Sequence, residues 1–154
     1  MLVMTARVDK KKIAIIAAGV LAVIVALVLL FGGSSSTPTS TATVSGNEDR
    51  VQFLASFGWE VVNSPVQTSQ VRIPEEFSQV FDRYNQLQKY QGYDLSAYAG
   101  KTVMRYVYTV KNYPGATEPV YATLLISGNK VIGGDITDTA PAGLVQGFQK
   151  IETT

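Results

Sequence analysis

Two aspartates near the end of the chain carry side chains suited to catalysis. Asp135 and Asp138 follow the pair Gly133-Gly134, so a flexible backbone presents two carboxylates. Such a pair can hold a divalent cation or act as a general acid and a general base. The spacing does not match a calcium loop, and paired glycines at a strand end more often mark a β-bulge or a close approach of two backbones. Hydrolysis by these carboxylates is the alternative to that structural interpretation.

A serine and a lysine three residues apart form a second candidate catalytic pattern. The segment Ser127-Gly128-Asn129-Lys130 matches S-x-x-K, in which a lysine activates a serine for acyl transfer. That chemistry requires a helix to bring residues three apart onto one face. Because Gly128-Asn129 favours a tight β-hairpin, we expect a turn here and no nucleophile.

The 154-residue chain contains no cysteine and no histidine. This composition excludes thiol nucleophiles, disulfide frameworks, zinc sites built on imidazole and catalytic triads with a histidine base. With 46% apolar and 16% charged residues, the chain also differs from a disordered polyelectrolyte. We predict no catalytic residue, no cofactor and no metal site, and therefore a protein that is not an enzyme.

Five residues are candidates for binding a ligand. All eight tyrosines lie between Tyr84 and Tyr121, and exposed aromatic rings bind sugars or peptides. An arginine within a predicted strand can donate to an anionic group. Tyrosines more often line the rim of a small core, with the ring buried and the hydroxyl in water, and a strand arginine more often faces solvent. The candidates are Tyr93, Asp94, Tyr98, Arg105 and Asp135.

The domain that positions these residues follows a predicted membrane segment. Residues 13–31 form an apolar run of 19 residues, which as a helix would extend about 28 Å, close to the ~30 Å of bilayer hydrocarbon. Residues 1–12 carry four basic side chains, and positive flanks remain in the cytoplasm. We predict a cytoplasmic tail over 1–12 and an uncleaved single-pass signal-anchor over 13–31. A cleaved signal peptide is the alternative, although its apolar region is usually shorter and ends at an A-x-A-like site.

The rest of the chain divides into a linker and one domain. Residues 32–46 are mainly glycine, serine and threonine, which predicts a flexible linker; a glycosylated stalk is the other interpretation. Residues 47–154 are numerous enough to form a core without disulfides, and we predict an extracytoplasmic domain there. This segment has 9 basic and 11 acidic residues, a net charge of −2, so a nucleic-acid partner is not expected.

Hydrophobic patterning predicts an α+β fold, a two-layer domain in which a long helix packs on an antiparallel sheet. Asn47 is expected to cap a short first helix that stops at Gly58. Short strands over 59–62 and 70–73 are predicted to pair as a hairpin. Three longer strands are predicted over 102–110, 120–126 and 130–136, and a loose helix is predicted over 144–148.

The long helix is predicted to begin at Pro74, which favours the first helical turn, and to end near residue 92. Asp94 or Ser96 is expected to cap a single turn after it. Apolar residues recur at spacings of three and four and predict one buried stripe, with Gln79, Arg83 and Gln86 facing water. The stripe consists of Phe77, Val80, Phe81, Tyr84 and Leu87.

Besides the basic start and the apolar run, a set of short segments within the predicted domain carries a family resemblance. These segments are Glu48-Asp49-Arg50, Phe53-Leu54, Phe57-Gly58-Trp59-Glu60-Val61, Ile73-Pro74-Glu75-Glu76-Phe77, Tyr84-Asn85, Leu87-Gln88, Gly92-Tyr93-Asp94-Leu95-Ser96, Tyr98, Gly100-Lys101, Arg105-Tyr106, Asn112-Tyr113-Pro114 and Ile132-Gly133-Gly134-Asp135. In this order they resemble the DUF4830 domain family of single-pass bacterial membrane proteins, found mainly in Firmicutes. The resemblance covers nearly all of the predicted domain, and it implies a bacterial cell envelope as the setting without implying any catalytic residue.

Together these features favour a membrane-anchored, extracytoplasmic binding or protein-interaction module. Its expected partners are the lipid bilayer, through residues 13–31, and an envelope protein or a small ligand. The alternatives are a small cell-envelope hydrolase that uses Asp135 and Asp138, and a secreted factor released by cleavage of the N-terminal segment.

Overall fold

The computed structural model describes residues 42–151. The predicted tail over 1–12, the predicted span over 13–31 and the linker up to residue 41 lie outside this range, as do residues 152–154. Within 42–151, no helix has both the length and the apolar character needed to cross a membrane.

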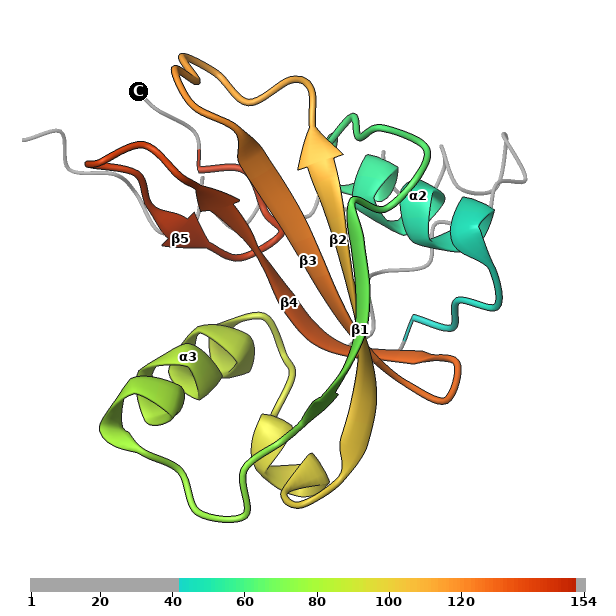
Figure 1. Cartoon of the computed structure of the whole chain (residues 1–154), viewed down its shortest axis with the longest axis vertical. Coiled ribbons are helices and arrows are strands. Elements are labelled where there is room, and N and C mark those ends of the chain that lie inside the picture. The colour runs from blue at the N-terminus through green and yellow to red at the C-terminus, as the bar shows by residue number, and fades with distance from the viewer. Residues whose placement is uncertain (1–41, 152–154) are drawn as a thin grey trace, which may run out of the picture. The chain divides into compact units, whose positions relative to one another are not determined.

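The described residues form an α+β domain around one antiparallel sheet (Figure 1). The strand order is β1-β2-β3-β4-β5, so each strand pairs with its neighbour in sequence. This confirms the predicted α+β class and the central three-stranded meander. The elements are α2 (Asn47–Ser56), β1 (Gln67–Arg72), α3 (Gln79–Tyr90), the 3₁₀ turn η1 (Leu95–Tyr98), β2 (Thr102–Val110), β3 (Val120–Ser127), β4 (Lys130–Asp138) and β5 (Val145–Gln146).

Side chains that alternate along β2 pack into two different apolar clusters, one on each face of the sheet. Tyr106 and Tyr108 belong to one apolar cluster, which includes residues of α2, whereas Val103 belongs to a second cluster with residues beside and within α3. Successive side chains of a strand point to opposite faces, so the two helices cover opposite faces of the sheet. We call these the α2 face and the α3 face. The predicted two-layer arrangement is corrected accordingly, because helices lie on both sides (Figure 1).

The predicted hairpin between residues 59–62 and 70–73 is wrong. Val61 forms an isolated bridge with Val110, at the end of β2, while β1 pairs with the other part of β2. Both segments therefore pair with one long strand and not with each other. The predicted loose helix over 144–148 is also wrong, because Val145 and Gln146 extend the sheet as β5 beside β4.

The folded domain begins earlier than the predicted boundary at residue 47. The Val131 amide donates to the Ala42 carbonyl at 2.9 Å, and the Val44 amide donates to the Asn129 carbonyl at 2.7 Å. The Val44 side chain is only 4% exposed and belongs to the α2-face core. Residues 42–46, assigned to the linker from composition, therefore pack against the β3–β4 hairpin.

Helix α2 begins with Gly46 as its N-cap, not with the predicted Asn47. The Asp49 carboxylate accepts from the backbone amides of Ser45 and Gly46, which satisfies donors at this helix start. Asn47 has another role, because its side-chain oxygen accepts a hydrogen bond from the Tyr108 hydroxyl at 2.8 Å.

Helix α3 starts at Gln79, five residues after the predicted start at Pro74. The Ser78 hydroxyl caps it by accepting from the Phe81 amide at 3.2 Å. Before the cap, Ile73 exchanges backbone hydrogen bonds with Gly100 and Lys101, which holds the chain extended at the end of β1.

The buried side of α3 differs from the predicted stripe. Val80 is 78% exposed, whereas the fully buried residues of the helix are Asn85 and Gln88. The predicted members Phe77, Phe81 and Tyr84 do pack against the second apolar cluster, and Gln79, Arg83 and Gln86 face water as predicted. The two buried amides escaped the apolar pattern because they pack by hydrogen bonding.

Candidate functional site

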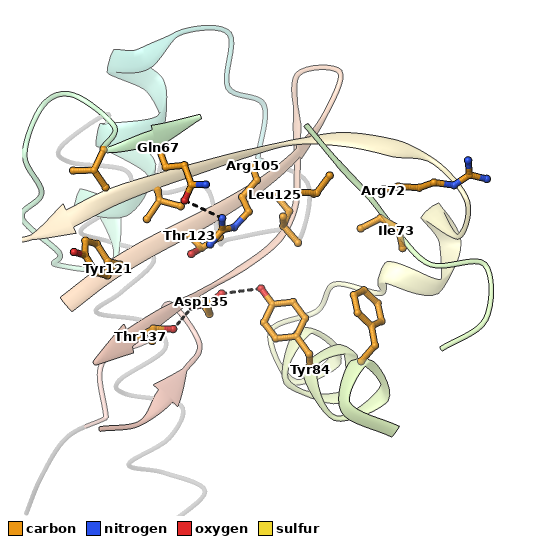
Figure 2. A pocket seen from close by; sticks show the side chains of 14 residues that line it. Gln67, Arg72, Ile73, Tyr84, Arg105, Tyr121, Thr123, Leu125, Asp135 and Thr137 are labelled. Atoms are coloured by element: carbon orange, nitrogen blue, oxygen red, sulfur yellow. Dashed lines mark hydrogen bonds between the residues drawn. The ribbon is translucent and has the colours of Figure 1, made fainter. Parts of the chain in front are cut away.

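An open cleft of about 810 Å³ lies on the α3 face. We call it the α3 cleft. Its floor is the sheet from β1 to β4, and α3 forms one wall through Phe81 and Tyr84 (Figure 2). Apolar side chains line much of it, while polar side chains gather at the middle of the floor. The apolar lining consists of Val66, Val71, Ile73, Phe81, Val107 and Leu125, and the polar lining consists of Gln67, Arg72, Tyr84, Arg105, Tyr121, Thr123, Asp135 and Thr137.

Asp135 is the central polar residue of the floor and is only 6% exposed. One carboxylate oxygen accepts from the Tyr84 hydroxyl at 2.8 Å, and the other accepts from the Thr137 hydroxyl at 2.6 Å (Figure 2). Tyr84 comes from α3, whereas Asp135 and Thr137 share one face of β4. The carboxylate is thereby oriented into the cleft, and each oxygen keeps a lone pair for a further donor.

Burial changes the acidity of both members of this hydrogen bond. It raises the pKa of Asp135, against the lowering effects of the hydrogen bonds from Thr137 and Tyr84 and of the positive charge of Arg105. Burial, followed by the negative charge of Asp135, raises the pKa of Tyr84 well above its ordinary value. Tyr84 therefore remains protonated and donates to the carboxylate.

Arg105 supplies the opposite charge within the same cleft. Within residues 42–151 its guanidinium makes one hydrogen bond, which it donates to the Gln67 side-chain oxygen at 3.2 Å (Figure 2). The ion pairs formed among residues 42–151 are Arg72–Glu75 and Lys89–Asp94, so Arg105 and Asp135 do not form one. Both charges face one cleft, and most of the five guanidinium donors remain available.

Two glutamines, the buried Gln88 and the half-buried Gln91, fix α3, and with it Tyr84, against β4. The Gln88 side-chain oxygen accepts from the Gly134 amide at 2.8 Å, and the Gln91 side-chain nitrogen donates to the Gly134 carbonyl at 3.0 Å. Gln91 also accepts from the Phe148 amide at 2.7 Å. At Gly134, which β5 does not reach, side-chain amides therefore bond the backbone amide and carbonyl at the edge of β4, where a neighbouring strand would otherwise do so.

The glycine pair before Asp135 allows this close approach. An added Cβ at Gly134 would lie 2.1 Å from the Thr123 carbonyl oxygen and 2.4 Å from the Phe148 ring. The register between β3 and β4 also shifts between Leu125 and Ile126, opposite this segment, as in a β-bulge. The structural interpretation of Gly133-Gly134 is therefore confirmed.

Asp94 is a helix cap and not part of the cleft. Its carboxylate accepts from the Ser96 amide and hydroxyl at 3.0 and 2.6 Å and from the Asn85 amide nitrogen at 3.0 Å. The side-chain hydrogen bond from Ser96, then those from Asn85 and the Ser96 backbone, lower the pKa of Asp94 to about 2. This confirms the predicted cap of η1, and it explains Asp94 as a structural residue.

The two candidate tyrosines lie apart from the α3 cleft. Tyr93 is buried in the α2-face core, in an edge-to-face contact with Phe148, and burial raises its pKa to about 12. It also lines a second, more apolar cleft of about 630 Å³ between α3 and β5. Tyr98 packs in the α3-face cluster, with the Lys101 ammonium 5.4 Å from its ring centre.

The alternative catalytic pair, Asp135 and Asp138, is not brought together. The residues are three apart on regular β4, opposite Thr123 and Val120 respectively, so their side chains point to opposite faces of the sheet. Asp138 instead accepts from the Ala140 amide at 3.0 Å in the turn after the strand. Among residues 42–151, no group of three acidic, cysteine or histidine side chains is placed to hold a metal ion.

Of the five sequence candidates, the structure brings Arg105 and Asp135 into one cleft. Sequence reasoning missed Tyr84, Thr123, Thr137 and Gln67 as members of that site. Thr123 gave the best available signal, because it is a polar residue in the middle of a mostly apolar strand. Tyr84 gave none, because a tyrosine on an apolar stripe is explained by packing alone.

A family model described as "Domain of unknown function (DUF4830)" matches residues 53–136. This range extends from α2 to β4 and includes most of the residues that line the α3 cleft. No curated protein and no solved structure matches the chain.

Proposed function

The chain belongs to the DUF4830 family, and from this premise we propose that it is a binding module that takes a small ligand into the α3 cleft. The observation that carries the proposal is the oriented, buried carboxylate of Asp135 in a cleft that also presents the Arg105 guanidinium. Mostly apolar walls with a few convergent polar groups are typical of small-molecule sites.

A binding role accounts for these residues better than hydrolysis does. Acid and base catalysis by two carboxylates requires that both reach one substrate, typically about 5 to 9.5 Å apart for glycosidic bonds. Asp138 faces away from the cleft that Asp135 lines. The remaining polar groups of the floor are hydroxyls, an amide and guanidinium groups, which suit recognition.

The proposal is tested by blocking the cleft. Thr123 is 7% exposed on the floor, so Thr123→Phe places a ring in the ligand volume. Ser127→Phe is the matched control, because Ser127 lies on the same strand and the same face but does not line the cleft.

Full-length protein and both variants are dialysed against a bacterial small-molecule extract, and retained compounds are identified by mass spectrometry. We expect at least one compound to be retained by the parent and by Ser127→Phe and to be lost from Thr123→Phe. The same retained compounds on all three proteins would refute binding in this cleft.

We also propose that residues 13–31 anchor the module in the cell membrane, with its C-terminal domain outside the cytoplasm. The apolar run and the basic residues before it support this topology. In intact bacterial cells, added protease should remove a C-terminal tag and leave an N-terminal tag intact. Protection of the C-terminal tag would refute the topology without affecting the cleft proposal.

A further inference from the structure

The two opposite charges of the α3 cleft are held apart by the sheet itself. Arg105 lies on β2 and Asp135 on β4, with β3 between them. Strands two positions apart are separated by about 10 Å, and the longer arginine side chain extends over Thr123 toward Asp135 (Figure 2). No ion pair joins Arg105 and Asp135 among the described residues. The space between the two charges is therefore part of the cleft.

Within the part of the chain that the structure describes, each charge also lacks its full set of partners. The Asp135 carboxylate receives two neutral hydroxyl donors and no cationic donor from residues 42–151, although it is almost completely buried. The Arg105 guanidinium finds one neutral acceptor among the same residues, Gln67. A buried carboxylate gains most from a cationic donor, and a guanidinium gains most from a carboxylate that accepts two parallel hydrogen bonds.

Building on the proposed function, we infer that the ligand is a small zwitterion of about dipeptide size, with its ammonium on Asp135 and its carboxylate on Arg105. The cleft volume of about 810 Å³ suits a ligand larger than a single amino acid. Apolar residues near the two charges, including Val71, Phe81 and Leu125, form a surface for aliphatic side chains. Tyr84 is a positioning residue, because it orients the carboxylate from α3.

The inference is tested with leucyl-leucine and two forms of it that each lack one charge. N-acetyl-leucyl-leucine lacks the ammonium, and leucyl-leucine amide lacks the carboxylate. Binding of each peptide to the full-length protein in a non-ionic detergent is measured by equilibrium dialysis. We expect leucyl-leucine to bind at least about tenfold more tightly than either blocked form, since each blocked form leaves one protein charge unpaired.

Two variants assign the charges to their partners. Arg105→Gln should weaken leucyl-leucine binding and abolish the preference over the amide, while the preference over the acetylated form remains. Asp135→Asn, which is nearly isosteric, should also weaken leucyl-leucine binding but abolish the preference over the acetylated form, while the preference over the amide remains. Arg83→Gln and Glu118→Gln are the controls, because both residues are exposed and neither lines the cleft, so they should bind all three peptides as the parent does.

Folding is checked in every variant by the fluorescence of Trp59, the single tryptophan of the chain, which is buried in the α2-face core and does not line the cleft. Equal binding of the three peptides, or no binding by folded parent protein, would overturn the zwitterion inference. The proposed function is judged separately, because retention of another compound that is lost in Thr123→Phe would still support ligand binding in the cleft.

Discussion

On the α2 face of the sheet, the buried Tyr108 and Trp59 have hydrogen-bond partners within the protein, whereas on the α3 face two charged groups have no charged partner among residues 42–151. The Tyr108 hydroxyl accepts from Arg50 and donates to Asn47, both at 2.8 Å, and the Trp59 ring nitrogen donates to the Phe148 carbonyl at 2.5 Å. Across the sheet, Asp135 and Arg105 face an open cleft. One sheet thus supplies a closed core on one side and a binding surface on the other.

The difference follows from what covers each face. Helix α2, the segment before it and the chain around Phe148 all pack onto the α2 face. On the α3 face, α3 is attached to β4 near Gly134, and the neighbouring part of the sheet forms the open cleft within residues 42–151. We infer that stability resides mainly on the α2 face, which leaves the other face free to carry charges that are costly to bury. Four predictions test this division.

The largest effect is expected on the α2 face, from Phe148→Ala. Phe148 is 1% exposed and contacts the rings of Phe53, Phe57 and Tyr93. Removal of a fully buried phenylalanine ring costs about 3 to 5 kcal/mol in free energy of unfolding. Urea denaturation of the full-length protein, followed by Trp59 fluorescence, measures the loss. A cost below that of Phe81→Ala would contradict the division.

A slightly smaller effect is expected when the domain is shortened at its start. A chain that begins at residue 47 lacks Val44 and the backbone hydrogen bonds of residues 42–46 to the β3–β4 hairpin. Loss of one buried valine costs about 1.5 to 3 kcal/mol, and the lost hydrogen bonds add to it. Residues 42–154 and 47–154 are compared by urea denaturation. Equal midpoints would mean that residues 42–46 do not stabilise the core.

On the α3 face, Phe81→Ala should cost less than Phe148→Ala. Phe81 is only half-buried, in contact with Phe77 at a ring-centre distance of 4.5 Å, so about half of the value for a full ring, roughly 2 kcal/mol, is expected. Gln79→Ala, at an exposed position of the same helix, should change the free energy of unfolding by less than about 0.5 kcal/mol. A cost for Phe81→Ala as large as that for Phe148→Ala would contradict the division, because the α3-face cluster would then stabilise the domain as much as the α2-face core does.

The smallest effect is a pH dependence contributed by Asp135. Its pKa is raised by burial above the ordinary 3.8, so the unfolded chain loses this proton at lower pH than the folded protein does. Stability should therefore fall as pH rises from 3.8 through the folded-state pKa, and Asp135→Asn should remove that decline. Urea midpoints of the parent and the variant across this pH range measure it.

Asp94 provides an internal control of opposite sign. Hydrogen bonds lower its pKa from 3.8 to about 2, so its contribution is present above pH 3.8 and is lost as pH falls toward 2. Asp94→Asn should remove that acid-side loss and leave the behaviour above pH 4 unchanged. If Asp135→Asn and Asp94→Asn changed the pH dependence of stability in the same direction, burial would not raise the pKa of Asp135 as expected.

Local sequence features predicted a large part of the fold. The alternation in β2, the Gly128-Asn129 turn and the cap at Asp94 each depend on residues close together in the chain, and the structure confirms them. The start of α3 was misplaced because Pro74 and the acidic residues after it suit a first helical turn. Long-range backbone pairing of Ile73 with Gly100 and Lys101 outweighed that local preference.

The sequence by itself determined which residue types occupy the strands and which chemistry is excluded, because composition and alternation are properties of the chain alone. Only the tertiary structure decided that Arg105 and Asp135 share a cleft, that Asp138 faces away from it, and that Tyr84 reaches Asp135 across 51 positions of sequence. Such pairs form only after strand order, register and helix placement are fixed. Those quantities depend on the whole core, since a shift of one residue in strand register would turn the side chains of the shifted strand, such as Arg105 on β2 or Asp135 on β4, to the opposite face.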